Sequence, residues 1–97
     1  MSRDHKEEYP EDLRQLRNIA LEIIRLHPNP NRFPLWSYLT AMTHMIQINH
    51  LCGMEYGEMV VAHVLDKLAT WHGEDAKRLK DELHDHLDWY NKCGRFV

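Results

Sequence analysis

Glycine and proline residues divide the chain into four stretches, and the hydrophobic residues of each stretch recur at helical spacing. The dividing residues are the segment Pro28 to Pro34, then Gly53, Gly73 and Gly94. Apolar positions at i, i+3, i+4 and i+7 lie on one face of a helix, so this pattern indicates amphipathic helices. The joints at Gly53 and Gly73 are short, and short joints favour antiparallel neighbours. We therefore predict an all-α fold, a compact four-helix bundle.

The first predicted helix opens at Tyr9 to Asp12 and ends before Pro28. A proline and two acidic residues suit the first turn of a helix, where the dipole favours negative charge. Residues 1–8 are polar, and we expect them to form a disordered tail that leaves residues 9–97 as a single helical domain. The predicted apolar stripe of this helix consists of Leu13, Leu16, Ala20, Ile23, Ile24 and His27.

The second predicted helix runs from about residue 34 to 52 and lacks Asp, Glu, Lys and Arg, so we expect it to be the most buried. The third covers about residues 55 to 72. The fourth begins at the acidic pair that follows Gly73 and runs to about Lys92. Its narrow apolar stripe consists of Ala76, Leu79, Leu83, His86, Leu87 and Tyr90. In an alternative arrangement, the second and third helices cross at a steep angle.

Residues 49–59 loosely resemble the turn of the helix-turn-helix family. Gly53 stands where that family has its turn glycine, and Met59 stands at a core position of the second helix. The resemblance implies a DNA-binding regulator that uses the second and third helices. The helix that would read DNA begins with Glu55, however, and no Lys or Arg occurs in residues 33–66. Acidic residues repel phosphates, so DNA binding stays an alternative rather than the main prediction.

The composition of the chain argues against nucleic-acid-binding, membrane and disulfide-rich proteins. The chain has 97 residues, of which 43% are hydrophobic and 28% charged, and its net charge is −3. This charge has the wrong sign for a typical nucleic-acid partner. No apolar run approaches the roughly 20 residues that span a bilayer, and the charged N-terminus does not resemble a signal peptide. Two cysteines do not make a disulfide scaffold, so we expect a cytoplasmic protein with reduced thiols and no membrane partner.

Histidine residues are the candidate ligands for a metal site. His84 and Asp88 are spaced i, i+4, which places them on one helix face as half of a zinc or manganese site. His63 and His72 are nominal candidates for the other half. In the interpretation that we favour, His86 lies on the core stripe while His84 and Asp88 are solvated. Whether the eight histidines of the chain bind metal or sense pH stays open.

The doublet His84-Asp85 is similar to that of the HD phosphohydrolases, which are all-helical enzymes. The resemblance implies a metal-dependent hydrolase that uses His84, His86 and Asp88, which is our third hypothesis. That family also needs an upstream histidine and a distant downstream aspartate around the metal. Only 12 residues follow the doublet in this chain.

No other pattern indicates catalysis. Cys52 and Cys93 each precede a glycine at the predicted C-terminal end of a helix, where the dipole raises the pKa of a thiol. A nucleophile needs the opposite shift. The chain also lacks the glycine-rich and serine motifs of nucleotide-binding proteins and hydrolases. We therefore expect a protein that is not an enzyme and that has no cofactor.

Aromatic residues at the margins of the apolar stripes suggest a partner-binding surface. Arginine and large aromatics dominate binding energy at protein interfaces, and a stiff loop loses little entropy on docking. The candidate partner-binding residues are Arg32, Phe33, Trp36, Trp89 and Phe96. We predict a small adaptor, regulator or inhibitor of a larger host protein complex, of bacterial or phage accessory type. A homodimer would also account for the aromatic residues near the C-terminus.

Overall fold

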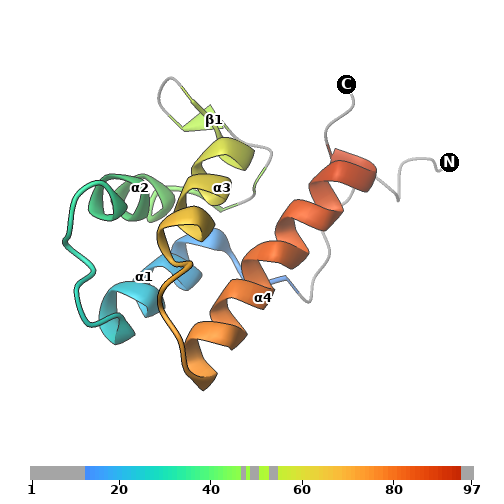
Figure 1. The fold of residues 1–97 in the computed structure, drawn as a ribbon. Coiled ribbons are helices and arrows are strands. Elements are labelled where there is room, and N and C mark those ends of the chain that lie inside the picture. The colour runs from blue at the N-terminus through green and yellow to red at the C-terminus, as the bar shows by residue number, and fades with distance from the viewer. Residues whose placement is uncertain (1–12, 47, 49–50, 53–54, 95–97) are drawn as a thin grey trace, which may run out of the picture.

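The computed structural model describes residues 13–46, 48, 51–52 and 55–94. Within them lie four α-helices: α1 (Leu16–Leu26), α2 (Leu35–Met42), α3 (Gly57–Lys67) and α4 (Glu74–Trp89). Helix α4 continues into a π-helical turn, η2 (Tyr90–Gly94). Each helix packs against the next one in the chain, and α4 also packs against α1, so the four close around one core (Figure 1). The predicted all-α, four-helix fold is confirmed.

The core receives buried side chains from all four helices. In α1 they fall at residues 16, 19, 20 and 23, which is the helical spacing that the sequence indicated. The predicted stripe omitted Ile19, which is fully buried, and included Ile24 and His27, which are half-buried. The largest fully buried side chains are Leu16, Ile19, Ile23, Leu39, Met42, Met45, Ile48, Leu68, Leu79, Leu83, His86 and Val60.

Helix α1 begins later than the sequence predicted. Residues 9–12 lie outside the described residues, and Gln15, the residue before the helix, is extended, with φ −60° and ψ 139°. The first two amides of the helix have partners from elsewhere in the chain. Leu16 N–H donates to the carbonyl of Ile46 at 3.1 Å, and Arg17 N–H donates to that of Met45 at 2.7 Å. These backbone bonds take the place of a side-chain cap.

Helix α2 ends at Met42, so the prediction that it continues to Cys52 was wrong. The chain turns after Met42, and its carbonyls at 45 and 46 satisfy the N-terminus of α1 instead of continuing the helix. Thr43 Oγ1 donates to the carbonyl of Thr40 at 2.6 Å. Such local side-chain bonds compete with helical ones. Met45 and Ile48 nevertheless reach the core, so the segment is buried without being helical.

A short hairpin replaces the expected helical corner before α3. Strands β1 (Leu51–Cys52) and β2 (Glu55–Tyr56) pair antiparallel, and α3 starts directly after them. Gly53, the expected cap and turn glycine, lies outside the described residues. Because residues 43–56 separate α2 from α3, the tight turn of a helix-turn-helix does not join these helices. The third helix is shorter than predicted at both ends. Residues 55–56 are extended, so it starts at Gly57, and it ends at Lys67 rather than His72.

Helix α4 matches its prediction closely. It starts after Gly73, whose φ of 119° and ψ of 174° form a backbone conformation open almost only to glycine. The residues at 76, 79, 83 and 86 are buried, as the stripe predicted. The α-helix ends at Trp89, and η2 carries the chain to Gly94. No helix among the described residues is both long enough and apolar enough to cross a membrane.

Candidate partner-binding surface

A hollow of about 510 Å³ lies between the loop that joins α1 to α2 and the end of α3. Its wall combines aromatic, aliphatic and basic side chains, and none of the described residues that line it is Asp or Glu. The lining residues are His27, Pro28, Asn29, Arg32, Phe33, Pro34, Leu35, Lys67, Thr70 and Trp71. Two of the predicted partner-binding residues, Arg32 and Phe33, are therefore part of a concave site.

The loop before α2 follows a defined course. Asn29 N–H donates to Nδ1 of His27 at 2.9 Å, and Trp36 N–H donates to the carbonyl of Arg32 at 2.9 Å. The Phe33–Pro34 peptide bond is cis. Because Nδ1 of His27 accepts this hydrogen bond, the imidazole is neutral. Burial lowers the pKa of His27, which also favours the neutral imidazole. These bonds hold the loop against the end of α1.

Phe33 is the most exposed large hydrophobic residue among those described, at 79%. Trp36 is 40% exposed, whereas Leu35 between them is 5% exposed and anchors the start of α2 in the core. An exposed phenylalanine gains nothing from folding, since hydrophobic stabilisation requires burial. Phe33 thus lies exposed on the loop and Trp36 on the first turn of α2, where Leu35 and hydrogen bonds fix the backbone.

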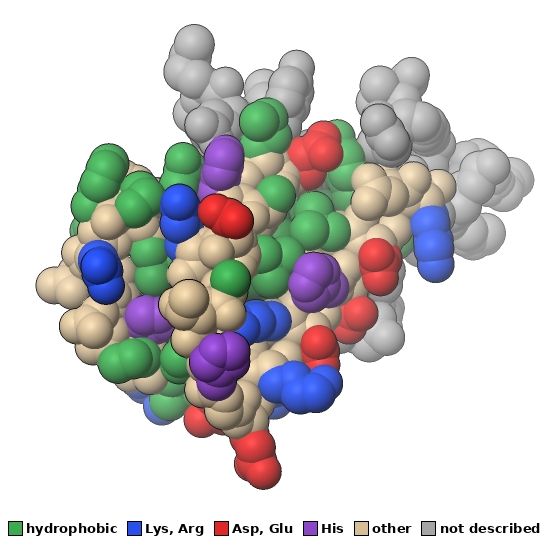
Figure 2. All heavy atoms as spheres, in the orientation of Figure 1, with side chains coloured by type: hydrophobic (Ala, Val, Ile, Leu, Met, Phe, Trp, Pro, Cys, Tyr) green, Lys and Arg blue, Asp and Glu red, His purple; other side chains and the backbone are tan. Residues whose placement is uncertain are grey.

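A second hollow, of about 390 Å³, shares Trp71 with the first. Lys80 Nζ donates to the carbonyl of Trp71 at 2.6 Å, and the His27 ring lies 4.9 Å from the Trp71 ring, so contacts from α4 and from the residue after α1 hold Trp71. The lining residues are Trp71, His72, Gly73, Lys77, Lys80, Asp81 and His84. Figure 2 shows histidine side chains, Lys or Arg side chains and acidic side chains together near the region where the chain leaves α3 and enters α4. We call the walls of the two hollows together the Trp71 surface.

The metal candidates do not form a cluster. His72 and His84 line the same hollow, but His63 stacks on Tyr38 with ring centroids 4.5 Å apart. Asp88 is exposed and does not line that hollow. Within the described part of the chain, no three His, Cys, Asp or Glu side chains are close enough to hold one ion.

His86 is fully buried, as the core interpretation predicted. Its Nε2 lies 2.8 Å from the carbonyl of Arg14, which places the ring between α4 and the start of α1. Nε2 donates to this carbonyl, and burial lowers the pKa of His86 because it disfavours the charged imidazolium. The residue therefore serves the core rather than a metal site.

The other sequence-predicted residues have mixed positions. Trp89 is half-buried and packs against the core, so only part of its ring faces solvent. Phe96 lies outside the described residues. Cys52 is in β1 and not at the end of a helix, which corrects the predicted dipole effect on its thiol. Cys93 lies in η2, at the C-terminal end of α4.

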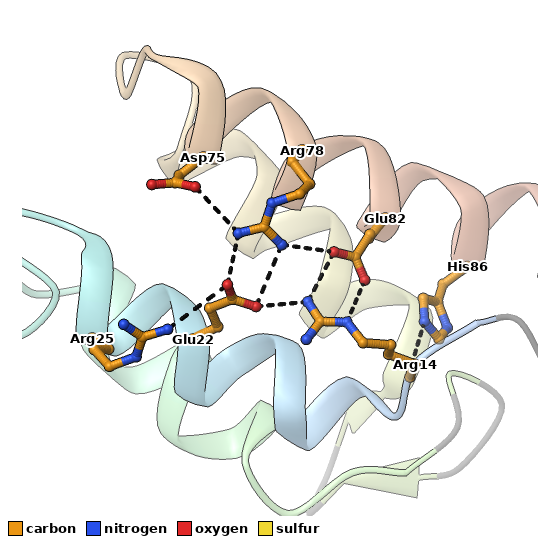
Figure 3. A network of polar contacts seen from close by, with 7 residues as sticks. All are labelled: Arg14, Glu22, Arg25, Asp75, Arg78, Glu82 and His86. Atoms are coloured by element: carbon orange, nitrogen blue, oxygen red, sulfur yellow. Dashed lines mark hydrogen bonds and ion pairs between the residues drawn. The ribbon is translucent and has the colours of Figure 1, made fainter.

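An ion-pair network joins α4 to α1 and to the residues just before it, and the sequence did not reveal it (Figure 3). Glu22 accepts hydrogen bonds from Arg78 Nη2 at 2.6 Å and from Arg14 Nη2 at 2.8 Å. Arg14 also pairs with Glu82, through Nε at 2.7 Å and Nη2 at 2.8 Å. The hydrogen bond from Arg78, followed by that from Arg14, lowers the pKa of Glu22 from 4.5 to about 2. The hydrogen bond to Glu82 is the main reason that the pKa of Arg14 is raised.

Comparison with protein-family models found no match, and comparisons with curated proteins and with solved structures found none either.

Proposed function

We propose that this protein is a small, cytoplasmic, non-enzymatic binding module that acts as an adaptor, regulator or inhibitor of a larger host protein complex. A bacterial or phage accessory protein is the type that fits its size. The partner-binding residues in this proposal are Arg32, Phe33 and Trp36 on the loop and first turn of α2, with Trp89 on α4.

One observation carries the proposal. Phe33 is 79% exposed on a hydrogen-bonded loop, directly beside a concave wall. Exposed aromatics beside a hollow are the usual anchors of protein interfaces, because they bury much area at a small entropic cost. The loop is already ordered, so a partner would not have to order it on binding.

The test is an affinity pull-down from an extract of the source organism, with and without nuclease treatment, read by mass spectrometry. The wild-type protein is compared with the variant Phe33→Ala plus Trp36→Ala. The matched control is Leu21→Ala plus Met59→Ala, which removes two hydrophobic side chains that are 54% and 46% exposed and line neither hollow. Circular dichroism verifies that both variants stay folded.

We expect the wild-type protein to capture a stoichiometric protein partner, with or without nuclease. The control variant should retain this partner, and the Phe33→Ala plus Trp36→Ala variant should lose it. A partner that both variants retain equally would remove the loop from the proposal. Partners that are lost on nuclease treatment would favour the DNA-binding alternative, and co-purification of an untagged copy of the chain with the tagged one would identify a homodimer.

A further inference from the structure

Positive charge is concentrated on the Trp71 surface, although the chain as a whole carries a net charge of −3. Four cations and one acid line the two hollows: Arg32, Lys67, Lys77, Lys80 and Asp81. The side chains that line this surface therefore carry a net positive charge, whereas the net charge of the whole chain is negative. A binding site whose charge differs from that of its protein selects ligands of the complementary charge.

The cations of this surface are only partly neutralised. Lys77 pairs with Asp81 at 3.0 Å, and Lys67 lies 3.5 Å from Asp66. Arg32 has no acidic partner within the part of the chain that the structure describes. The arginines between α1 and α4 differ from it, since carboxylates satisfy them from two helices (Figure 3). Arg32 thus keeps its charge available at the edge of the first hollow.

Aromatic groups lie among these cations. Trp71 is half-buried and belongs to both hollows, while Phe33 is exposed at the wall of one of them. Because Trp71 lines both hollows, a ligand that occupies both would contact this residue. It would meet aromatic surface and positive charge together, which suits a segment that carries both apolar and acidic groups.

We infer that the Trp71 surface binds an extended, acidic segment of the partner protein, with an apolar side chain between Phe33 and Trp71 and carboxylates beside Arg32 and Lys67. The inference rests on the proposed function, because it specifies the chemistry of that partner. A peptide can place its acids opposite the cations alone. A nucleic acid carries a phosphate at every nucleotide, and it would also meet Glu74 and Asp75 in the first turn of α4.

The experiment is a fluorescence-anisotropy titration with short labelled peptides in which glutamate and leucine alternate. One reference peptide has glutamine in place of glutamate, and another has serine in place of leucine. A single-stranded oligonucleotide of similar length tests the nucleic-acid alternative. Each titration is run at low and at high salt, because attraction between exposed charges weakens with ionic strength.

We expect the glutamate–leucine peptide to bind most tightly and to lose affinity at high salt. Arg32→Gln plus Lys67→Gln should weaken it about tenfold, which is the effect of removing two partly exposed charge pairs. The charge-matched control, Arg17→Gln plus Lys92→Gln, removes two exposed cations that line neither hollow and should leave the affinity within about twofold. In the NMR spectrum, the indole N–H of Trp71 should shift on binding.

The inference is overturned if the glutamate and glutamine peptides bind equally, if neither binds, or if the oligonucleotide binds more tightly than either. Its failure is distinguishable from that of the proposed function. A partner from the extract that depends on Phe33 and Trp36, but not on Arg32 and Lys67, would preserve the binding module and refute the acidic segment. Partner binding that depends neither on Phe33 and Trp36 nor on Arg32 and Lys67 would refute both the proposed function and the acidic segment.

Discussion

Replacing Glu22 with glutamine should destabilise the fold and reduce its sensitivity to acid. Glu22 is the carboxylate that Arg14 and Arg78 share, and its side chain is only 17% exposed. Glutamine keeps the size of the side chain but removes its charge, so the two guanidinium groups lose the common anion between α1 and α4. The expected effect is a lower free energy of unfolding near neutral pH.

The lowered pKa sets an upper limit to the magnitude. A fall from 4.5 to about 2 corresponds to roughly 3 kcal/mol at about 1.4 kcal/mol per pKa unit. The arginine side chains are 42% and 44% exposed, and solvent screens such pairs. We therefore expect Glu22→Gln to cost about 1–2 kcal/mol. Because folding lowers the pKa of this carboxylate, its contribution is complete above pH 4.5 and disappears as the pH falls toward 2.

Urea unfolding followed by circular dichroism, repeated across the acid range, measures both effects. The control is Asp81→Asn, which breaks the more exposed pair with Lys77 and should cost less than about 0.5 kcal/mol. The wild type and Glu22→Gln should converge in stability at low pH. If Glu22→Gln costs no more than Asp81→Asn, or if the two curves stay parallel through the acid range, the network does not stabilise the fold as argued.

Three further predictions concern the core, a glycine and a buried histidine. Leu83→Ala should cost about 2–5 kcal/mol in urea unfolding, because Leu83 is fully buried in the core, and a loss below about 1 kcal/mol would contradict its position. Gly73→Ala should destabilise the fold by about 1–3 kcal/mol and lower the melting temperature. An added Cβ would meet open space, so the cost comes from the positive φ of residue 73, which alanine rarely adopts. An unchanged melting temperature would argue against that backbone conformation. For His86, burial lowers the folded-state pKa below 6.5, so the unfolded chain binds the proton first and wild-type stability falls as the pH drops through 6.5. His86→Leu should flatten this slope, measured against a His84→Leu control whose ring is exposed, and equal slopes would refute the assignment.

The sequence predicted the helices best where a single element carries its own signals. Gly73, the acidic first turn and the stripe from Ala76 to His86 all belong to α4, and they defined its start and its buried face. The same stripe placed His86 in the core. For the candidate surface, the exposed aromatics and Arg32 were visible as a stiff, aromatic loop next to Pro34.

The start of α1 and the C-terminal end of α2 depend on contacts between distant segments of the chain. The apolar residues through Met45 and Ile46 continue at a spacing that also fits a helix, so the sequence alone favoured a long α2. The carbonyl groups of Met45 and Ile46 bond to the first amides of α1 instead, and this bond pattern exists only after the two segments meet. Local periodicity reports which residues are buried, but not which backbone partner each one finds.

Hydrophobic periodicity by itself determined that this chain folds into four helices, since burial of apolar side chains is a local requirement on each stretch. Tertiary structure alone decided the pairing of Glu22 with Arg78 and the meeting of the loop at Phe33 with Trp71. These residues are far apart in the chain, and no local pattern encodes which helix faces will lie opposite each other. The charge and shape of the candidate binding surface arise from that packing.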